Sequence, residues 1–192
     1  YEHVAYESKG FLQAYGSGPK PIFKENIGFD VYLNIINQAK KYLYITTPYL
    51  ICDYSLLEAL VLAKRRGVDV KLITPHIPDK KTMFMLTRSN YKPLLEAGIE
   101  VYEYKPGFIH TKMFVCDDEY ATIGTVNLDY RSFIHHYECG LWMYKEASIL
   151  DMKADFLDTA SSDGIRMNLK KIRRPWIICI LKDILKIFAP LF

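Results

Sequence analysis

The sequence has 192 residues, about 50% of them apolar, and a net charge of +3. This length supports one domain with a substantial core and excludes two large ones. The small net charge gives no sign of nucleic-acid binding, and no Gly, Pro or Ser tract indicates a disordered class. The cysteines are widely spaced and lack a Cys-x-x-Cys pair, which argues against zinc sites and disulfide frameworks: Cys52, Cys116, Cys139 and Cys179.

The chain begins with Tyr1, and residues 3–9 already have the pattern of a strand, with no signal peptide before them. We therefore interpret the sequence as a piece of a longer chain. Residues 11–19 predict a strand that ends in a Gly/Pro turn, and residues 26–41 have the apolar period of a helix. Residues 42–50 are typical of a short buried strand that stops at a proline.

Residues 55–67 predict a helix with Ser55 as its N-cap, a basic last turn and a glycine at its end. A strand is expected at residues 68–75. Residues 79–98 then predict one long helix, bent at Pro93.

A strand at residues 99–104 leads into a hairpin at residues 107–127. Another strand at 138–145 and a helix at 147–162 follow it. This alternation predicts an α/β fold, an α-β-α sandwich with a mixed β-sheet. We expect one catalytic lobe at residues 1–163.

Residues 164–192 form the second expected unit, a basic tail with an amphipathic helix of about 13 residues. Apolar positions 177, 180, 181, 184, 187 and 188 share one face of this helix. The helix is too short and too charged to span a bilayer. It would dock on the core or lie on an acidic membrane, and the basic stretch before it favours the membrane.

The hairpin carries the residues that could take part in catalysis. On a strand, alternate side chains share a face, so His110 and Lys112 are expected to point together. An imidazole can act as a nucleophile or as a proton donor, while lysine and asparagine can hold phosphate oxygens. Glu138 begins the next strand and could orient His110 by a hydrogen bond. This set suits phosphoryl chemistry without a metal or other cofactor.

The full pattern is His110-x-Lys112-x4-Asp117-x6-Gly124-Thr125-x-Asn127. It resembles the signature of the phospholipase D superfamily, in which the glycine is usually followed by Ser, so Thr125 departs from it but keeps the hydroxyl. Residues 47–75 and 124–144 are similar to segments of bacterial cardiolipin synthases, including the second catalytic motif of those enzymes. Cys52 stands where these enzymes often have Pro. The resemblance covers nearly the whole chain and identifies it as their C-terminal lobe.

The resemblance implies transfer of a phosphatidyl group between two phosphatidylglycerol molecules through a phosphohistidine, giving cardiolipin and glycerol. It implies His110 as general acid/base, Lys112 and Asn127 as phosphate ligands, and Glu138 as the group that orients His110. Asp117 would support the site without touching the substrate. The tight backbone at Gly124 and the hydroxyl of Thr125 complete the set.

Such chemistry needs two His-x-Lys motifs, and this sequence has one. The partner would be a missing N-terminal lobe or a second copy of this lobe, so the lobe alone should be inactive. A location on the cytosolic side of a bacterial membrane is expected, with an anchor upstream, acidic lipid as a partner and no nucleic acid.

Two other functions remain open. The chain could be a homodimeric phosphodiesterase or nuclease of the same superfamily, or a non-catalytic lobe that binds acidic lipid. A chance polar pair at a sheet edge is the remaining interpretation of His110 and Lys112.

Overall fold

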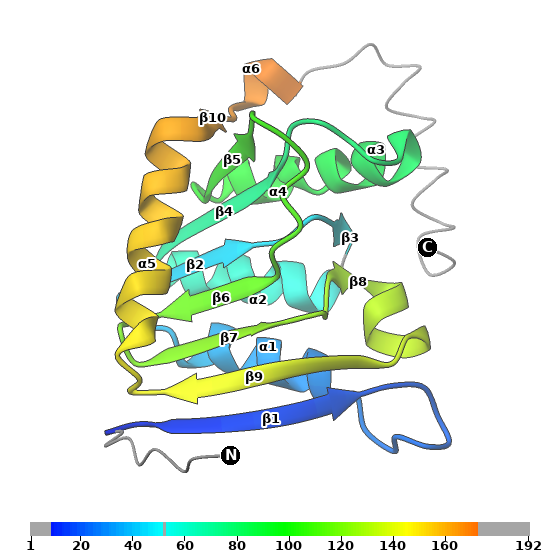
Figure 1. The fold of residues 1–192 in the computed structure, drawn as a ribbon. Coiled ribbons are helices and arrows are strands. Elements are labelled where there is room, and N and C mark those ends of the chain that lie inside the picture. The colour runs from blue at the N-terminus through cyan, green and yellow to red at the C-terminus, as the bar shows by residue number, and fades with distance from the viewer. Residues whose placement is uncertain (1–8, 52, 173–192) are drawn as a thin grey trace.

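The computed structural model describes residues 9–51 and 53–172 (Figure 1). Its strands are β1 Phe11–Ser17, β2 Tyr42–Thr46, β3 Leu50–Ile51, β4 Asp69–Pro75, β5 Glu100–Tyr104, β6 Met113–Cys116, β7 Tyr120–Gly124, β8 Leu128–Asp129, β9 Glu138–Tyr144 and β10 Gly164–Arg166. Its helices are α1 Ile27–Gln38, α2 Tyr54–Arg65, α3 Lys81–Ser89, α4 Tyr91–Glu96, α5 Ser148–Asp158 and α6 Leu169–Ile172. Two π-helical turns, η1 and η2, cover Arg131–His135 and Thr159–Asp163.

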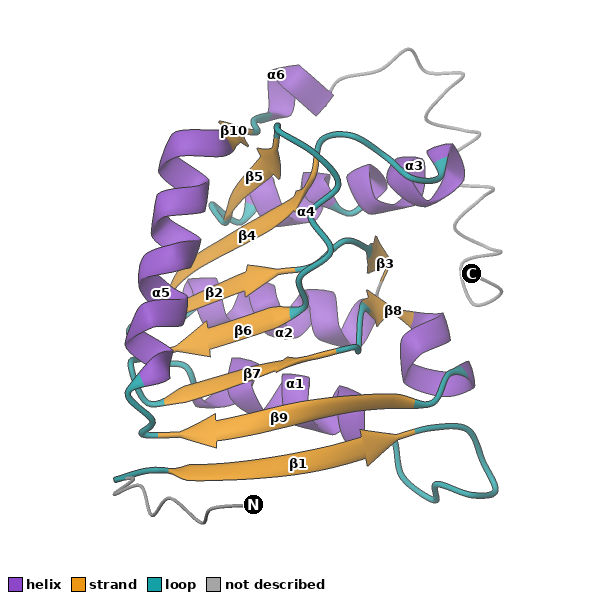
Figure 2. Ribbon diagram, in the orientation of Figure 1, coloured by secondary structure: helices purple, strands orange, loops and turns teal. Residues whose placement is uncertain are grey.

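The main sheet has eight strands in the order β1-β9-β7-β6-β2-β4-β5-β10 (Figure 2). Strands β2, β4 and β5 are parallel, whereas β6, β7, β9 and β1 form an antiparallel half and β10 closes the other edge. The short strands β3 and β8 pair separately and in parallel. This arrangement confirms the predicted α/β class with a mixed sheet.

Both faces of the sheet are covered. Leu43 and Phe114 pack in one core cluster with residues of α1, α2 and α4, while Tyr44 and Val115 pack in a second cluster with Phe156 of α5. The helices can be followed on the two sides of the sheet in Figure 1. Because strand side chains alternate and both faces are buried, β2 is buried along its whole length.

The prediction of one continuous helix at residues 79–98 is wrong. The segment is divided at Asn90 into α3 and α4, three residues before the expected bend. The buried amide of Asn90 donates a 2.8 Å hydrogen bond to the carbonyl of Leu50, which ties the break to β3. Pro93 lies in the first turn of α4, where a helix does not need its backbone N–H.

The N-cap of α2 also differs from the prediction. Asp53, not Ser55, caps the helix, and its carboxylate accepts a 3.1 Å hydrogen bond from the backbone N–H of Leu56. The hydroxyl of Ser55 donates to the same carboxylate at 2.8 Å. Aspartate and serine are both favoured at the N-cap, so the sequence alone did not decide between Asp53 and Ser55.

The sheet continues past residue 163, where the tail was expected to begin. Strand β10 pairs with β5, and Met167 is buried in the main core. The amphipathic helix expected within residues 173–192 and the strand expected at residues 3–9 lie outside the described residues, except for residue 9. No helix in the described part of the chain has the length and apolar character needed to cross a bilayer.

Candidate active site

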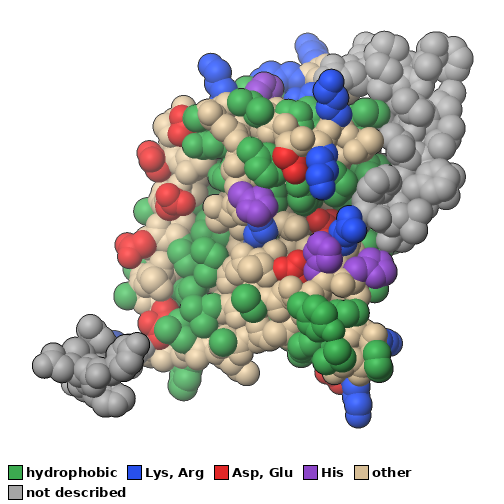
Figure 3. All heavy atoms as spheres, turned by 45° about the vertical axis from the view of Figure 1, so that its right-hand side comes forward, with side chains coloured by type: hydrophobic (Ala, Val, Ile, Leu, Met, Phe, Trp, Pro, Cys, Tyr) green, Lys and Arg blue, Asp and Glu red, His purple; other side chains and the backbone are tan. Residues whose placement is uncertain are grey.

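One hollow of about 460 Å³ holds every predicted site residue except Asp117. It lies at the start of β6, the end of β7 and the start of β9, on the side of the molecule that comes forward in Figure 3. On that face, histidine, basic and acidic side chains gather near a hydrophobic patch. The hollow is lined by His110, Thr111, Lys112, Ile123, Gly124, Thr125, Asn127 and Glu138.

His110 and Lys112 do not lie on the strand, as the sequence predicted, but in the segment that leads into it. Strand β6 begins at Met113, because the pairing of β6 with β2 begins there. The His110 side chain is exposed and its ring centroid lies 5.6 Å from that of Phe108. Lys112 is only 6% exposed, and its Nζ donates a 2.6 Å hydrogen bond to the carbonyl of His110.

The electrostatic environment shifts both groups toward their neutral forms. Burial lowers the pKa of Lys112 to about 8, against the opposing effect of the Glu138 and Asp129 carboxylates. Burial and then the charge of Lys112 lower the pKa of His110 below its usual value, and Asp79 opposes this. The site therefore combines an imidazole that is readily neutral with a buried ammonium that can hold an anion.

Gly124 and Thr125 bind the hairpin tightly to β9. A side chain at Gly124 would place its Cβ 2.3 Å from the carbonyl oxygen of Cys139. The backbone N–H of Thr125 donates to that same oxygen at 2.8 Å, and its hydroxyl accepts from the Cys139 N–H at 3.0 Å. The expected hydroxyl is thus present at the hollow and is engaged with the backbone of β9.

Asn127 is held by residues that the sequence reasoning missed. Its Nδ2 donates a 3.0 Å hydrogen bond to Oγ of Ser132, and the N–H of Ser132 donates to the buried carboxylate of Asp129 at 2.7 Å. Burial raises the pKa of Asp129, and the hydrogen bonds from Ser132 oppose this. The buried Oδ1 of Asn127 has no hydrogen-bond partner within the described chain. The signal was the stretch "NLDYRS", which begins at Asn127 itself.

Glu138 lines the hollow, but its carboxylate contacts a different histidine from the one expected. Its Oε1 lies 3.5 Å from Nδ1 of His136. No hydrogen bond joins Glu138 to His110 in the described part of the chain. The expected orienting contact is therefore absent from this arrangement, in which the nearby imidazole is that of His136.

Asp117 lies at the far end of β6 from the hollow. Its carboxylate accepts hydrogen bonds of 2.7 to 2.9 Å from the backbone N–H groups of Lys40, Lys41 and Tyr42. These contacts fasten the β6–β7 turn to the start of β2. The geometry assigns Asp117 to the support of the sheet.

The sequence also gave no indication of the residues that lie on the other side of His110. The hydroxyl of Tyr49 donates a hydrogen bond to the carboxylate of Asp79, and the Tyr49 ring centroid lies 6.2 Å from that of Phe108. Phe108 in turn contacts the His110 ring. This brings a carboxylate from the loop after β4 to the site, which no local pattern in the sequence indicated.

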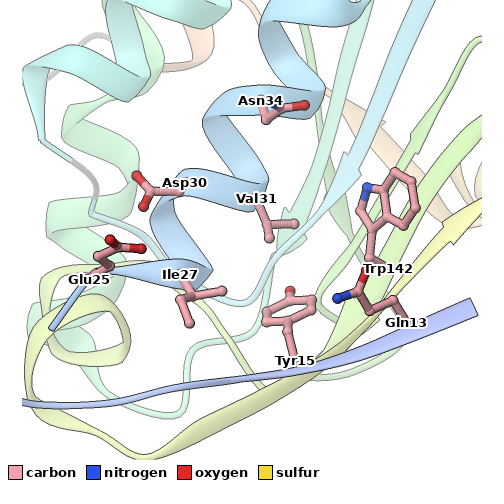
Figure 4. A pocket seen from close by; sticks show the side chains of 8 residues that line it. All are labelled: Gln13, Tyr15, Glu25, Ile27, Asp30, Val31, Asn34 and Trp142. Carbon is pink, nitrogen blue, oxygen red and sulfur yellow. The ribbon is translucent and has the colours of Figure 1, made fainter. Parts of the chain in front are cut away.

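A separate hollow of about 380 Å³ lies between β1 and α1 (Figure 4). Tyr15 and Trp142 form its aromatic side, and the exposed carboxylates Glu25 and Asp30 lie near the start of α1. It contains no residue of the predicted site.

The comparisons with known proteins agree with this geometry. Residues 32–159 match the family model described as "Cardiolipin synthase, PLD-like domain". The chain is 37% identical over 183 residues to a cardiolipin synthase of Halalkalibacterium halodurans, covering 95% of this chain and 36% of the relative. It is 46% identical to an uncharacterized protein of Streptococcus mutans over 83% of this chain and 36% of that protein. The chain thus spans about a third of the length of these relatives.

Solved structures share the fold at low sequence identity. The phosphatidylserine synthase of Haemophilus influenzae matches with a TM-score of 0.72 at 19% identity, over 94% of this chain and 46% of that one. The phospholipase D family member Nuc of Salmonella typhimurium matches with a TM-score of 0.69 at 17% identity, over 83% and 99% of the two chains. By its sequence and its fold, the chain belongs to the cardiolipin synthase family of phospholipase D-like proteins.

Proposed function

We propose that this chain is one lobe of an enzyme that transfers a phosphatidyl group between two phosphatidylglycerol molecules. The observation that carries the proposal is the convergence of His110, Lys112, Asn127 and Glu138 on one hollow. An imidazole, a buried ammonium and an amide together suit a phosphodiester, whose negative charge needs cations and hydrogen-bond donors. The family membership selects phospholipid as the substrate class.

The reaction proceeds in two displacements. A histidine nitrogen attacks the phosphorus of one phosphatidylglycerol, the bond from phosphorus to the glycerol oxygen breaks, and the second histidine gives that oxygen a proton. A hydroxyl of another phosphatidylglycerol then attacks the phosphohistidine and gives its proton to the second histidine, so that cardiolipin forms and the nitrogen–phosphorus bond breaks. We assign the proton-transfer role to His110 and phosphate binding to Lys112 and Asn127.

The other histidine comes from another part of a longer enzyme or from a second copy of this chain. The His-x-Lys pattern occurs once in these 192 residues, and the chain spans only 36% of its cardiolipin synthase relatives. On its own the chain is therefore expected to bind phosphate but not to complete the transfer. We place the assembled enzyme at the cytosolic face of a bacterial membrane, in contact with acidic lipid.

The test is cardiolipin formation from phosphatidylglycerol by the full-length protein, followed by thin-layer chromatography. His110→Asn should abolish the product, while His135→Asn, which changes an exposed histidine outside the hollow, should leave it near normal. Normal cardiolipin formation by His110→Asn would favour a lobe that only binds lipid. Cleavage of DNA without action on phosphatidylglycerol would favour the phosphodiesterase alternative.

A further inference from the structure

The contact between Glu138 and His136 gives the candidate site a histidine that the catalytic pattern does not include. The side chain of Glu138 is only 8% exposed, whereas that of His136 is 49% exposed. The pair therefore lies at the rim of the hollow, with the carboxylate inside and the imidazole facing solvent. A buried carboxylate is costly without a compensating charge or hydrogen bond, and the His136 imidazole lies within ion-pair distance of it in the described chain.

The backbone places His136 for this contact. Its N–H donates a 3.0 Å hydrogen bond to the carbonyl of Arg131, at the end of the π-helical turn η1. His136 itself is extended, with φ of −98° and ψ of 150°. Residues two positions apart in extended chain share a side, so His136 and Glu138 point the same way.

Two carboxylates and two basic groups share this region. Glu138 and the buried Asp129 both act electrostatically on Lys112, and His136 also acts on Asp129. The single hydrogen bond of the Lys112 ammonium goes to the carbonyl of His110, not to either carboxylate.

We propose that His136 is a positioning residue that holds the Glu138 carboxylate and competes with His110 for it. The contact with His136 holds the Glu138 carboxylate, and removal of the imidazole leaves the carboxylate available to His110, which lines the same hollow. The availability of Glu138 to the proton-transferring histidine is thus set by its contact with His136. The inference rests on the proposed function for its meaning in catalysis, since it concerns the same site.

The competition is measurable by proton NMR, from the titration of the histidine Cε1–H signals of this chain. His136→Phe frees Glu138 and should raise the pKa of His110 by about one pH unit, the lower end of what an adjacent carboxylate causes. His135→Phe is the matched control, since His135 is an exposed neighbour that forms no ion pair with Glu138. It should leave His110 unchanged. Lys112 and Asp79, the charged groups that act on His110, stay in place in both variants.

A double-mutant comparison identifies the carboxylate responsible. In a Glu138→Gln background, His136→Phe should no longer move the titration of His110, because no carboxylate remains to be released. His136→Ala, which removes the imidazole and leaves no side-chain donor, should shift His110 in the same direction as His136→Phe and guards against a folding defect caused by the bulky phenyl ring.

An unchanged His110 titration in both His136 variants would overturn the proposal, as would a shift of equal size in the Glu138→Gln background. The titration uses no substrate. If the full-length protein made no cardiolipin, the proposed function would be overturned, but the titration result would stand. The two failures are therefore distinguishable.

Discussion

Asp117 and Lys112 stand at opposite ends of β6, although the catalytic pattern groups them together. The carboxylate of Asp117 accepts three backbone hydrogen bonds at the start of β2, while Lys112 lines the hollow. Asp117 also has a φ of 57°, in the left-handed region that suits Asp and Asn better than Ala. Its hydrogen bonds and its backbone conformation thus support the hairpin turn.

Replacing Asp117 by Ala should therefore destabilise the fold by about 2 kcal/mol, the scale for hydrogen bonds to a charged group. Asp117→Asn keeps one acceptor oxygen and the turn conformation, so its loss should be smaller. Urea denaturation followed by circular dichroism measures both. If the Ala variant were as stable as the parent but could not bind phosphate, Asp117 would belong to the active site after all.

The alternation of strands and helices was predictable because both faces of the sheet are buried and the apolar period is strong. The gathering of His110, Lys112, Asn127 and Glu138 was likewise predictable, from the spacing on the hairpin and the next strand and from the resemblance to the phospholipase D signature. The position of His110 outside the strand was not predictable, because an alternating pattern of polar and apolar residues looks the same in sequence whether it lies in a loop or in a strand.

The partner of Glu138 was also hidden, since it depends on how η1 turns the chain before His136. Asp79 reaches the site from the loop after β4 through a contact with Tyr49, 30 positions away in the sequence. Tertiary contacts of this kind leave no local pattern.

The close approach at Gly124 predicts a strong effect of one added methyl group. In Gly124→Ala, the Cβ would meet the backbone of Cys139 and Gly140 at 2.3 and 2.6 Å, and the paired strands β7 and β9 would have to separate. A loss of about 3 kcal/mol is expected, as for overpacking in a core. Gly107→Ala is the control from the same stretch of sequence, because its Cβ would meet nothing within 4 Å. Thermal unfolding of the two variants should differ clearly, and equal melting temperatures would contradict the close contact between β7 and β9 at this position.

The N-cap of α2 can be assigned by comparing the stability of two variants. Asp53→Ala removes the acceptor for the Leu56 N–H and should cost about 1 kcal/mol. Ser55→Ala removes only a hydroxyl that donates to Asp53, so its effect should stay within about 0.5 kcal/mol. Free energies of unfolding from urea titrations measure both losses. A larger loss for Ser55→Ala than for Asp53→Ala would assign the cap to Ser55.

Asp79 should favour the protonated form of His110. Its negative charge opposes the lowering of the His110 pKa, so Asp79→Asn should move that pKa further down. At a fixed neutral pH a smaller fraction of His110 would then carry the proton that the leaving glycerol needs. NMR titration of His110 measures the shift directly. Glu25→Gln, which removes a carboxylate from the separate hollow of Figure 4, should produce none, and equal shifts in the two variants would mean that the effect is not local.

Lys112 should make phosphate binding depend on pH within an accessible range. Because burial lowers its pKa to about 8, the ammonium is charged below that pH and becomes neutral above it. Affinity for diethyl phosphate, a diester whose charge stays constant, should therefore be steady over the range in which His110 is neutral and Lys112 is charged, and fall about tenfold for each pH unit above the Lys112 pKa. Calorimetric titration of the chain over this range gives the profile. Lys112→Arg supplies the control, since a guanidinium stays charged throughout and should remove the decline. A decline of the same steepness in that variant would assign the pH dependence to another group.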